Sequence, residues 1–289
     1  MSVQLDARLG HQNLMAYNRA MTQWCSRGAL HEEDGALLVA GGSWIPLIGN
    51  GAFRTEEAVA PGALLDRADT FFARRKRGYT VKVRESGEDA DLQEACEAHG
   101  LVAFGDPIPQ MICRRRLERT TPPADVCLRE VRDEEGIADF AAVNTDAYAT
   151  YGMPAEVFVD MFDRPGRILA STQTSIVVGY RGTRPVATAL SFVSDGVACL
   201  QWVGTVADAR HLSLGRFVTE WATNNAFERG ATSVTLQASA MGEPLYARLG
   251  YETQYHYREY VRWEPPASSP MGSSRARESS RSSRAVTRA

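Results

Sequence analysis

Residues 203–216 combine residue types that can bind an anion. They read V-G-T-V-A-D-A-R-H-L-S-L-G-R and join a predicted strand to a predicted helix. The first N–H groups of a helix lack intrahelical acceptors and lie at the positive end of the helix dipole, so a pyrophosphate placed there gains several hydrogen bonds. Small residues at Ser213 and Gly215 open the backbone to an anion, and Arg210 and Arg216 add positive charge. On this segment alone, an ordinary serine-started helix is an equal alternative.

The elements that position this loop follow from the periodicity of the second half of the chain. Predicted strands lie at 127–131, 174–180, 186–193, 197–203, 233–237 and 255–263, and predicted helices at 133–148, 154–162, 212–229 and 243–249. Turns at Arg181-Gly182-Thr183 and Asp195-Gly196 separate three of the strands. We therefore expect the order β-α-α-β-β-β-α-β-α-β, with the longest C-terminal helix directly after the candidate anion loop.

The first half of the chain resembles the second. We expect helices at 12–27, 62–77 and 89–99, strands at 36–40, 43–48 and 79–83, and an extended segment at 110–114. The segment C-E-A-H-G-L-V at 96–102 aligns with Y-A-R-L-G-Y-E at 246–252, so that Gly100 stands opposite Gly250. Each is a helix end, a glycine and an apolar residue, which favours an internal duplication.

Length and composition favour two domains. The chain has 289 residues and a mass of 31.7 kDa, with 44% hydrophobic and 23% charged residues, enough for an ordinary globular core. The segment R-T-T-P-P-A-D at 119–125 is a predicted linker between a domain at 1–118 and a second at 126–263. Residues 264–289 are rich in Ser and Arg with almost no large apolar residue, so we expect a disordered tail.

Charge and cysteine usage exclude several classes of function. A net charge of -3 gives no general reason to bind nucleic acid. The five cysteines are odd in number and lack a C-x-x-C pair, so we expect free thiols and no metal site.

The N-terminal sequence has no apolar stretch after a basic start, so we expect no secretory signal and a cytoplasmic protein. Residues 35–53 carry no charge, but glycines, Pro46 and Asn50 interrupt them. Two strands therefore fit this stretch better than a membrane span, and no membrane partner is expected.

Two motifs carry a family resemblance. The segment R-H-L-S-L-G at 210–215 resembles the R/Q-x-x-G-x-G/A signature of the GNAT superfamily of acyl-CoA-dependent N-acetyltransferases. Further along, L-Y-A-R-L-G-Y at 245–251 resembles the L-Y-x-x-L-G-F element of that superfamily, and the element order of 126–263 also matches. Ser213 stands where the family usually has its first glycine. The resemblance implies an α/β (α+β) fold of two tandem GNAT-like domains, each a mixed, mostly antiparallel sheet flanked by helices.

The resemblance implies acetyl-CoA as co-substrate and a set of residues that bind it. In the family, the strand before the loop separates from its neighbour, and the pantetheine arm binds its exposed backbone, here at Val203, Gly204 and Thr205. The pyrophosphate then lies on the amides of Arg210, His211, Leu212, Ser213, Leu214, Gly215 and Arg216. Tyr246 matches the family tyrosine near the coenzyme sulfur and is the candidate acid that protonates the departing thiolate. Without the resemblance, packing beside Leu245 and Leu249 is the preferred interpretation of Tyr246.

The general base and the acceptor site are less defined. Residues 200–203 contain no Glu, Asp or His, so a water relay is the expected base. His211, His256 and Ser239 fit solvent-facing, structural and turn roles better than catalysis. In the family the acceptor pocket uses the connection between the first two helices, where Tyr151 and Met153 would form an apolar wall or only anchor the loop. No acidic cluster there supports a polycationic acceptor.

The first half lacks an equivalent anion loop. Residues 54–62 read R-T-E-E-A-V-A-P-G, with two carboxylates and a proline where an anion needs amides and positive charge. This half resembles the degenerate first domain of tandem GNAT proteins. The resemblance implies that it would support the active half and form one wall of the acceptor cleft.

We therefore predict that the protein is an N-acetyltransferase that acts on a primary amine, and two alternative functions remain open. The missing base favours a non-catalytic acyl-CoA sensor or scaffold, and mycothiol synthase is a rival tandem member. Oligomeric state stays open.

Overall fold

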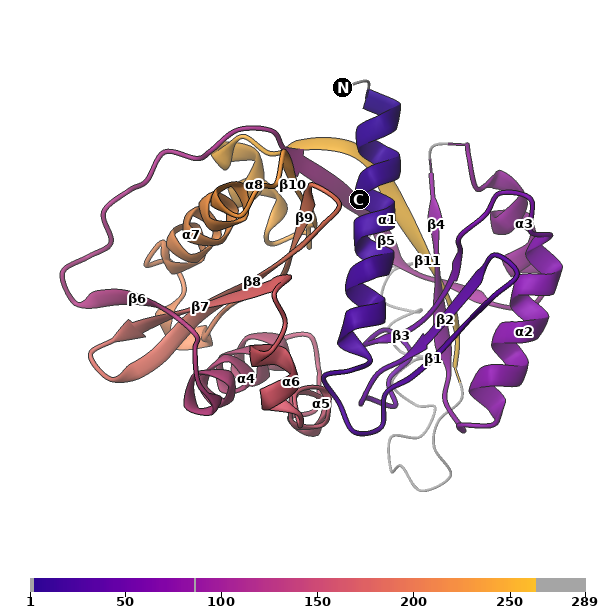
Figure 1. The fold of residues 1–289 in the computed structure, drawn as a ribbon, viewed down its shortest axis with the longest axis horizontal. Helices are drawn as coiled ribbons and strands as arrows, with labels where there is room; N and C mark the ends of the chain where they lie inside the picture. The colour runs from indigo at the N-terminus through magenta and orange to yellow at the C-terminus, as the bar shows by residue number, and fades with distance from the viewer. Residues whose placement is uncertain (1–2, 86, 264–289) are drawn as a thin grey trace, which may run out of the picture.

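The computed structural model describes residues 3–85 and 87–263, which form one eleven-stranded sheet with helices on both faces (Figure 1). The strand order is β1-β2-β3-β4-β11-β5-β10-β9-β8-β7-β6. The pairs β3–β4 and β9–β10 are parallel, and the other neighbours are antiparallel. This mixed, mostly antiparallel arrangement confirms the predicted fold class, while the predicted tail at 264–289 lies outside the described residues.

The first half contributes three longer helices and five strands. They are α1 (Val3–Met21), β1 (Ala29–Glu33), β2 (Ala36–Ala40), β3 (Asn50–Arg54), α2 (Pro61–Ala73), β4 (Tyr79–Arg84), α3 (Ala90–Ala98) and β5 (Val102–Cys113). The second half contributes β6 (Val126–Glu130), α4 (Glu134–Ala149), α5 (Glu156–Met161), α6 (Pro165–Leu169), β7 (Thr174–Arg181), β8 (Arg184–Ser194), β9 (Val197–Thr205), the 3-10 turn η1 (Ala207–Ala209), α7 (Leu214–Glu228), β10 (Ser233–Gln237), α8 (Glu243–Leu249) and β11 (Glu252–Arg262).

One predicted strand is wrong. Residues 43–48 form a turn, and β2 instead pairs with β1 and β3 on its two sides. The Asn50 side chain donates hydrogen bonds to the carbonyls of Ser43 (2.9 Å) and Ile45 (2.8 Å), which holds the apolar run in a turn. The Asp34-Gly35 pair, with φ of 46° and 72°, closes the β1–β2 hairpin that the sequence prediction missed.

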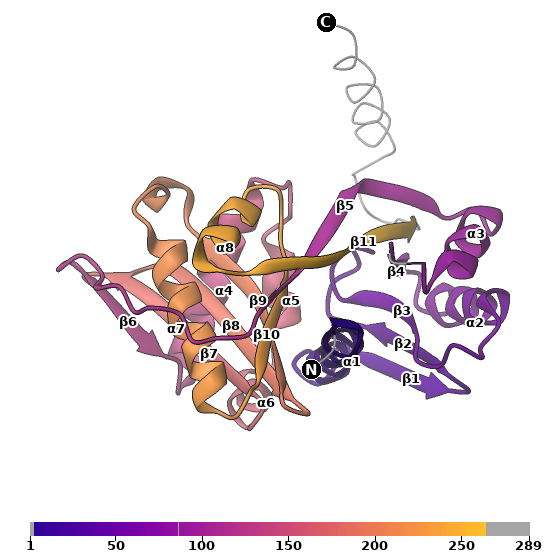
Figure 2. The same ribbon diagram turned by 90° about the horizontal axis from the view of Figure 1, so that it is seen from above.

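The two halves exchange their last strands (Figure 2). β5 ends the first half but pairs with β10, whereas β11 ends the second half and pairs with β4. The two exchanged strands pair with each other in the centre. Gly100 and Gly250, with φ of 79° and 94°, end α3 and α8 directly before these strands, as the predicted duplication requires. The sheet therefore runs without a break through both halves, and the linker at 119–125 stays a prediction.

Helix α1 lies between the two halves and packs against both of them (Figure 1). Its Met15 packs with Leu37 and Val39 on one face of the first half. Its Leu14 and Tyr17 join an apolar cluster that includes α4, α5 and the second-half sheet. The N-terminal helix is thus part of the second half's core as well as the first's.

Helix α7 fixes the connection between the halves. The side chain of Asn224 accepts from the amide of Leu117 (2.8 Å) and donates to its carbonyl (3.0 Å). The buried carboxylate of Glu220 accepts from the amide (3.0 Å) and hydroxyl (2.6 Å) of Thr120. The other face of α7 carries Leu214, Val218 and Ala222 into the core against the sheet, so the helix after the candidate loop is held on two sides.

Among the described residues, no helix is long and apolar enough to cross a membrane. The same residues contain no group of three His, Cys, Asp or Glu side chains arranged to hold a metal ion. All five cysteines are free thiols, and Cys127 is the exposed one.

Candidate active site

The parallel strands β9 and β10 separate partway along their length. Their ladder joins Ser233 to Val197 and ends where Thr235 pairs with Cys199. Beyond that point the Gln201 side chain reaches across the gap, with its Nε2 donating to Gln237 Oε1 at 3.1 Å. Among the described residues, no ladder pair joins β9 to β10 beyond Cys199, and the predicted positions Val203, Gly204 and Thr205 lie in this open part of β9.

A bulge in β9 sits at the point of separation. Gln201 pairs with Leu190 and Gly204 with Thr188, so Trp202 and Val203 together stand opposite one residue of β8. Trp202 adopts φ of 55°, in the left-handed region that a bulky residue rarely occupies. The bulge turns the Trp202 side chain onto the face covered by α4 and α5, where it joins the apolar cluster there.

The loop after β9 presents a row of free amides. After η1, His211 and Ser213 both have positive φ, 65° and 59°. The amide N–H groups of residues 211–215 make no hydrogen bond to any described residue, and the Ser213 side chain does not cap α7. Five successive donors at the N-terminus of a fifteen-residue helix can bind a diphosphate. Ser213 occupies a backbone conformation that favours glycine, which gives the family's usual glycine there a physical reason.

The two arginines of the loop are engaged with protein groups. Arg210 donates to the carbonyl of Ala147 (3.2 Å) and the hydroxyl of Thr150 (3.3 Å) at the C-terminal end of α4. Arg216 donates from Nε to Glu220 one turn along α7 (2.5 Å). Arg210 therefore ties the loop to the helix that carries Tyr148.

Tyr246 lies buried on α8 with its hydroxyl free. A Cβ on Gly242 would stand 2.8 Å from the Tyr246 ring, so the glycine makes room for it, and the Tyr251 ring lies edge-on at 5.9 Å. The hydroxyl makes no hydrogen bond to any other described residue. Burial raises the pKa of Tyr246 above its usual value, and the nearby phenols of Tyr148 and Tyr151 raise it further. This phenol stays protonated and can donate, as the candidate acid must.

The two predicted acceptor residues lie across from α8. Tyr151 is half exposed, and its hydroxyl donates to Ser239 Oγ at 3.4 Å. Ser239 also accepts from the amide of Gly242, so its hydroxyl contacts both the turn before α8 and the α4–α5 connection. Met153 packs against the aromatic cluster of α4 and α5. Of the histidines, His211 is exposed in the loop, and His256 lies on β11 beside Pro109 of β5.

Sequence reasoning missed an aromatic cluster around Trp202. The indole lies 5.6 Å from the Tyr148 ring and 5.8 Å from each of the rings of Phe158 and Phe162. Its N–H donates to the hydroxyl of Tyr17 on α1, at 2.5 Å. The sequence holds no signal for this cluster beyond the aromatic residues themselves, since V-A-C-L-Q-W-V at 197–203 predicts an ordinary strand.

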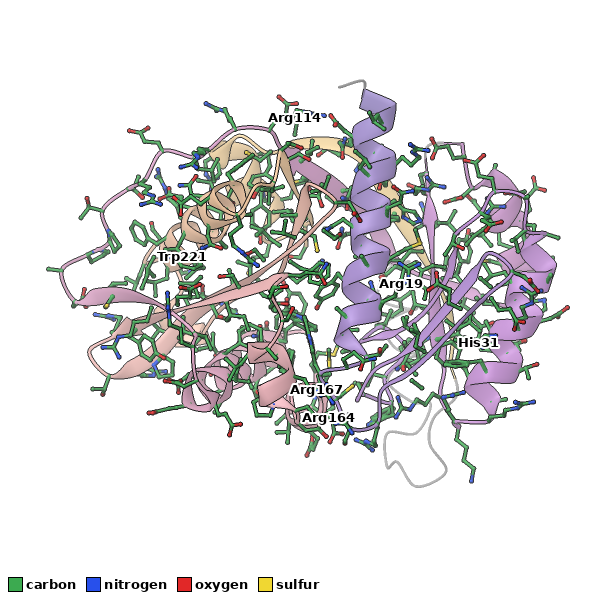
Figure 3. All side chains as sticks on the ribbon, in the orientation of Figure 1. Arg19, His31, Arg114, Arg164, Arg167 and Trp221 are labelled. Carbon is green, nitrogen blue, oxygen red and sulfur yellow. The ribbon has the colours of Figure 1, made fainter. Side chains whose placement is uncertain are left out.

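The first half also fixes the segment between α5 and α6. The carboxylate of Asp163 accepts from the amide of Ser26 (2.7 Å) and from its hydroxyl. The amide of Arg164 donates to the carbonyl of Trp24 at 3.0 Å, and Figure 3 shows Arg164 near the lower end of α1. Contacts from the first half thus hold the helices that surround Trp202.

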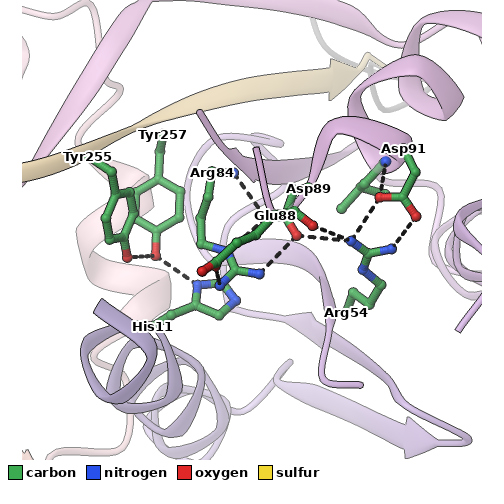
Figure 4. Close-up of polar contacts among 9 residues, drawn as sticks. His11, Arg54, Arg84, Glu88, Asp89, Asp91, Tyr255 and Tyr257 are labelled. Carbon is green, nitrogen blue, oxygen red and sulfur yellow. Dashed lines mark hydrogen bonds and ion pairs between the residues drawn. The ribbon is translucent and has the colours of Figure 1, made fainter. Parts of the chain in front are cut away.

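In the first half, an ion cluster fills the place that corresponds to the β9–β10 gap (Figure 4). The β3–β4 ladder ends where Ala52 pairs with Val81. Beyond it, Arg54 of β3 and Arg84 of β4 both donate to the buried carboxylate of Asp89 (3.0 and 2.8 Å). The two arginines hold the pKa of Asp89 at about 2 against the opposing effect of burial. This gap is closed by ion pairs, and Pro61 at the start of α2 removes an amide donor.

Comparisons with known proteins agree with this geometry. The family model of the acetyltransferase (GNAT) domain matches residues 112–244. A GCN5-related N-acetyltransferase from Kribbella flavida is 22% identical in sequence, with a TM-score of 0.62. The structural match covers 86% of this chain and 94% of the Kribbella chain. A GCN5-related N-acetyltransferase from Sphaerobacter thermophilus is 15% identical in sequence, with a TM-score of 0.57. The match covers 82% of this chain and 83% of the Sphaerobacter chain.

A tandem GNAT protein from the clavulanic acid biosynthesis pathway is 13% identical in sequence, with a TM-score of 0.56. The match covers 84% of this chain and 85% of the tandem protein. At these identities the likeness shows the fold. The comparison with curated proteins gave no match.

Proposed function

We propose that this chain, whose residues 112–244 belong to the acetyltransferase (GNAT) family, transfers an acetyl group from acetyl-CoA to the primary amine of a small molecule. The observation that carries the proposal is the open β9–β10 edge followed by the free amides of residues 211–215. Together they offer a backbone edge for a pantetheine arm and a donor row for a diphosphate.

Two groups of backbone atoms would bind two different parts of acetyl-CoA. The backbone of Val203, Gly204 and Thr205 would pair with the amides of the pantetheine arm, as an added strand pairs with a sheet edge. The amides of residues 211–215 would hold the diphosphate. Both groups lie on rigid elements, because β8 fixes one side of β9 and the core fixes α7.

The chemistry requires one proton donor at the sulfur. The neutral amine nitrogen attacks the thioester carbonyl carbon, the tetrahedral intermediate expels the thiolate, and the thiolate takes a proton from the Tyr246 hydroxyl. Water takes the proton that the nitrogen loses, and Tyr246 regains its own from solvent. The free and protonated Tyr246 hydroxyl supports this role.

Amine-dependent release of free CoA thiol from acetyl-CoA tests the proposal. We expect release with wild-type protein, and a fall in kcat of about 10²-fold or more in Tyr246→Phe with an unchanged Kd for coenzyme A. Tyr251→Phe is the matched control, since the Tyr251 hydroxyl bonds to Thr223 of α7 at 2.6 Å and has no role in the reaction. Absence of any heat on titration with coenzyme A would refute the proposal.

One observation favours a second function, a non-catalytic acyl-CoA sensor. Residues 200–203 of β9, the strand beside the proposed pantetheine arm, contain no Glu, Asp or His that could act as a base. A sensor would bind acetyl-CoA in calorimetry and release thiol no faster with amines than by hydrolysis alone. No described contact favours the mycothiol synthase alternative specifically.

A further inference from the structure

Apolar and aromatic side chains line the acceptor side of the β9 bulge. Trp202 from the bulge, Tyr148 from α4 and Met153 from the following loop are each partly buried in one cluster. Tyr151 is half exposed, and its ring lies 5.9 Å from that of Tyr148. Three separate segments therefore bring aromatic rings together beside the β9 bulge.

The side chains that pack around these rings are apolar or aromatic. Burial among them raises the pKa of Tyr148, and Tyr151 raises it further. Two acidic side chains on the neighbouring helices α4 and α5 are engaged elsewhere. Asp146 accepts from the amide of Ala207 at 2.7 Å, and Asp160 pairs with Arg27 of the first half. A second ammonium group packed against the rings of this apolar cluster would lose water without gaining a counter-charge from the cluster.

The Trp202 ring is held in place before any ligand binds. Its indole N–H donates to Tyr17, and edge-to-face contacts with Phe158 and Phe162 hold the ring as well, while Trp202 stays only partly buried. A fixed aromatic surface binds an apolar group at low entropic cost. Tyr17 comes from α1, so the first half takes part in building this surface.

We infer that the acceptor, in the reaction proposed above, is a monoamine with an aromatic or apolar body that packs on Trp202, Tyr148, Tyr151 and Met153. The inference rests on the proposed function and narrows it. It assigns the aromatic surface to the body of the substrate and the region beside Tyr246 to its amine.

Thiol release with a panel of amines tests the inference. The panel contains 2-phenylethylamine and hexylamine, ethanolamine as a small polar amine, and spermidine and kanamycin as polycations. We expect kcat/KM for 2-phenylethylamine to exceed the values for ethanolamine and spermidine by about tenfold or more, because a phenyl group leaves water. Equal or higher kcat/KM with spermidine or kanamycin overturns the substrate class and leaves acetyl transfer standing. No amine-dependent release at all is the failure of the proposed function.

Variants at Tyr151 link the preference to the surface. Tyr151→Ala should lower the ratio of kcat/KM for 2-phenylethylamine to that for ethanolamine about fivefold, and Tyr151→Phe should restore it because the ring remains. Phe104→Ala is the matched control, a comparably exposed aromatic on β5 that packs on Trp263 outside the site. A ratio unchanged by Tyr151→Ala, or lowered equally by Phe104→Ala, contradicts the inference.

Discussion

Gly42 lies directly against the main chain of Asp160, and a Cβ built on Gly42 would stand 2.0 Å from the Asp160 carbonyl oxygen. Gly42 belongs to the turn between β2 and β3, and Asp160 to α5. The same short helix carries Phe158, whose ring contacts Trp202. The close approach of the two halves at this glycine therefore bears on the position of the proposed acceptor surface.

Gly42→Ala should disturb both stability and acceptor binding. The added methyl group meets backbone atoms, which cannot move aside as a side chain can, so we expect a loss of about 1–3 kcal/mol in the free energy of unfolding. KM for the amine should rise, while the Kd for coenzyme A stays the same, since the β9–β10 edge lies elsewhere. Urea unfolding and steady-state kinetics measure the two effects.

Gly62→Ala is the matched control, because an added Cβ there meets no atom within 4 Å and the residue lies in α2. We expect it to be neutral or slightly stabilising. Equal stability of the two alanine variants would show that the halves do not meet at Gly42 as described.

Ser213→Gly should stabilise the protein without weakening coenzyme binding. Ser213 has φ of 59°, a conformation that costs a residue with a Cβ roughly 1 kcal/mol and costs glycine nothing. Ser213→Val should do the opposite, since β-branched residues tolerate this region least. Thermal unfolding and calorimetric titration with coenzyme A check both variants. Tenfold weaker binding by Ser213→Gly would instead assign a ligand contact to the hydroxyl.

The local parts of the site could be predicted from the sequence. The observed bounds of β10 and α8 agree with the predicted 233–237 and 243–249, because apolar periodicity and the glycine at 250 are signals within a few residues. The predicted helix at 212–229 is observed as α7 (Leu214–Glu228), which begins two residues later than predicted. Helix and strand bounds that depend on short-range backbone preferences can therefore be predicted from the sequence.

The parts that depend on distant segments could not be predicted. The bulge at Trp202 depends on the register of β9 against β8, and the bond from its indole to Tyr17 joins residues 185 positions apart. The sequence likewise shows the charges of Arg210 and Arg216 but not that protein groups engage both. Such features follow from the packing of the whole sheet.

Asp89→Asn should destabilise the protein strongly. The substitution leaves Arg54 and Arg84 buried without their shared counter-charge, which costs about 3–5 kcal/mol. Asp34→Asn is the control, because its ion pair with Arg67 is exposed and contributes about 1 kcal/mol or less. Urea unfolding compares the two. A loss as small for Asp89→Asn as for Asp34→Asn would show that the cluster does not hold β3 and β4.

The buried imidazole of His11 should make the protein less stable in mild acid (Figure 4). Burial, aided by the charge of Arg84, lowers the pKa of His11 from 6.5 to about 4, and its Nδ1 bonds to the Tyr257 hydroxyl at 2.8 Å. As pH falls from 6.5 towards 4, the unfolded chain binds a proton that the folded chain does not, so stability present at neutral pH is lost. The full loss is about 3 kcal/mol.

This window is separate from that of the buried carboxylate nearby, since Asp89, with its pKa of about 2, loses its contribution only at lower pH. Urea unfolding at pH 7, 5.5 and 4.5 should therefore show a fall that His11→Gln largely abolishes, because glutamine does not titrate. His31→Gln, at an exposed histidine, should keep the wild-type dependence. If the two variants lose stability in parallel as the pH falls, the proton taken up on unfolding does not belong to His11, and its imidazole is not held neutral between α1 and β11.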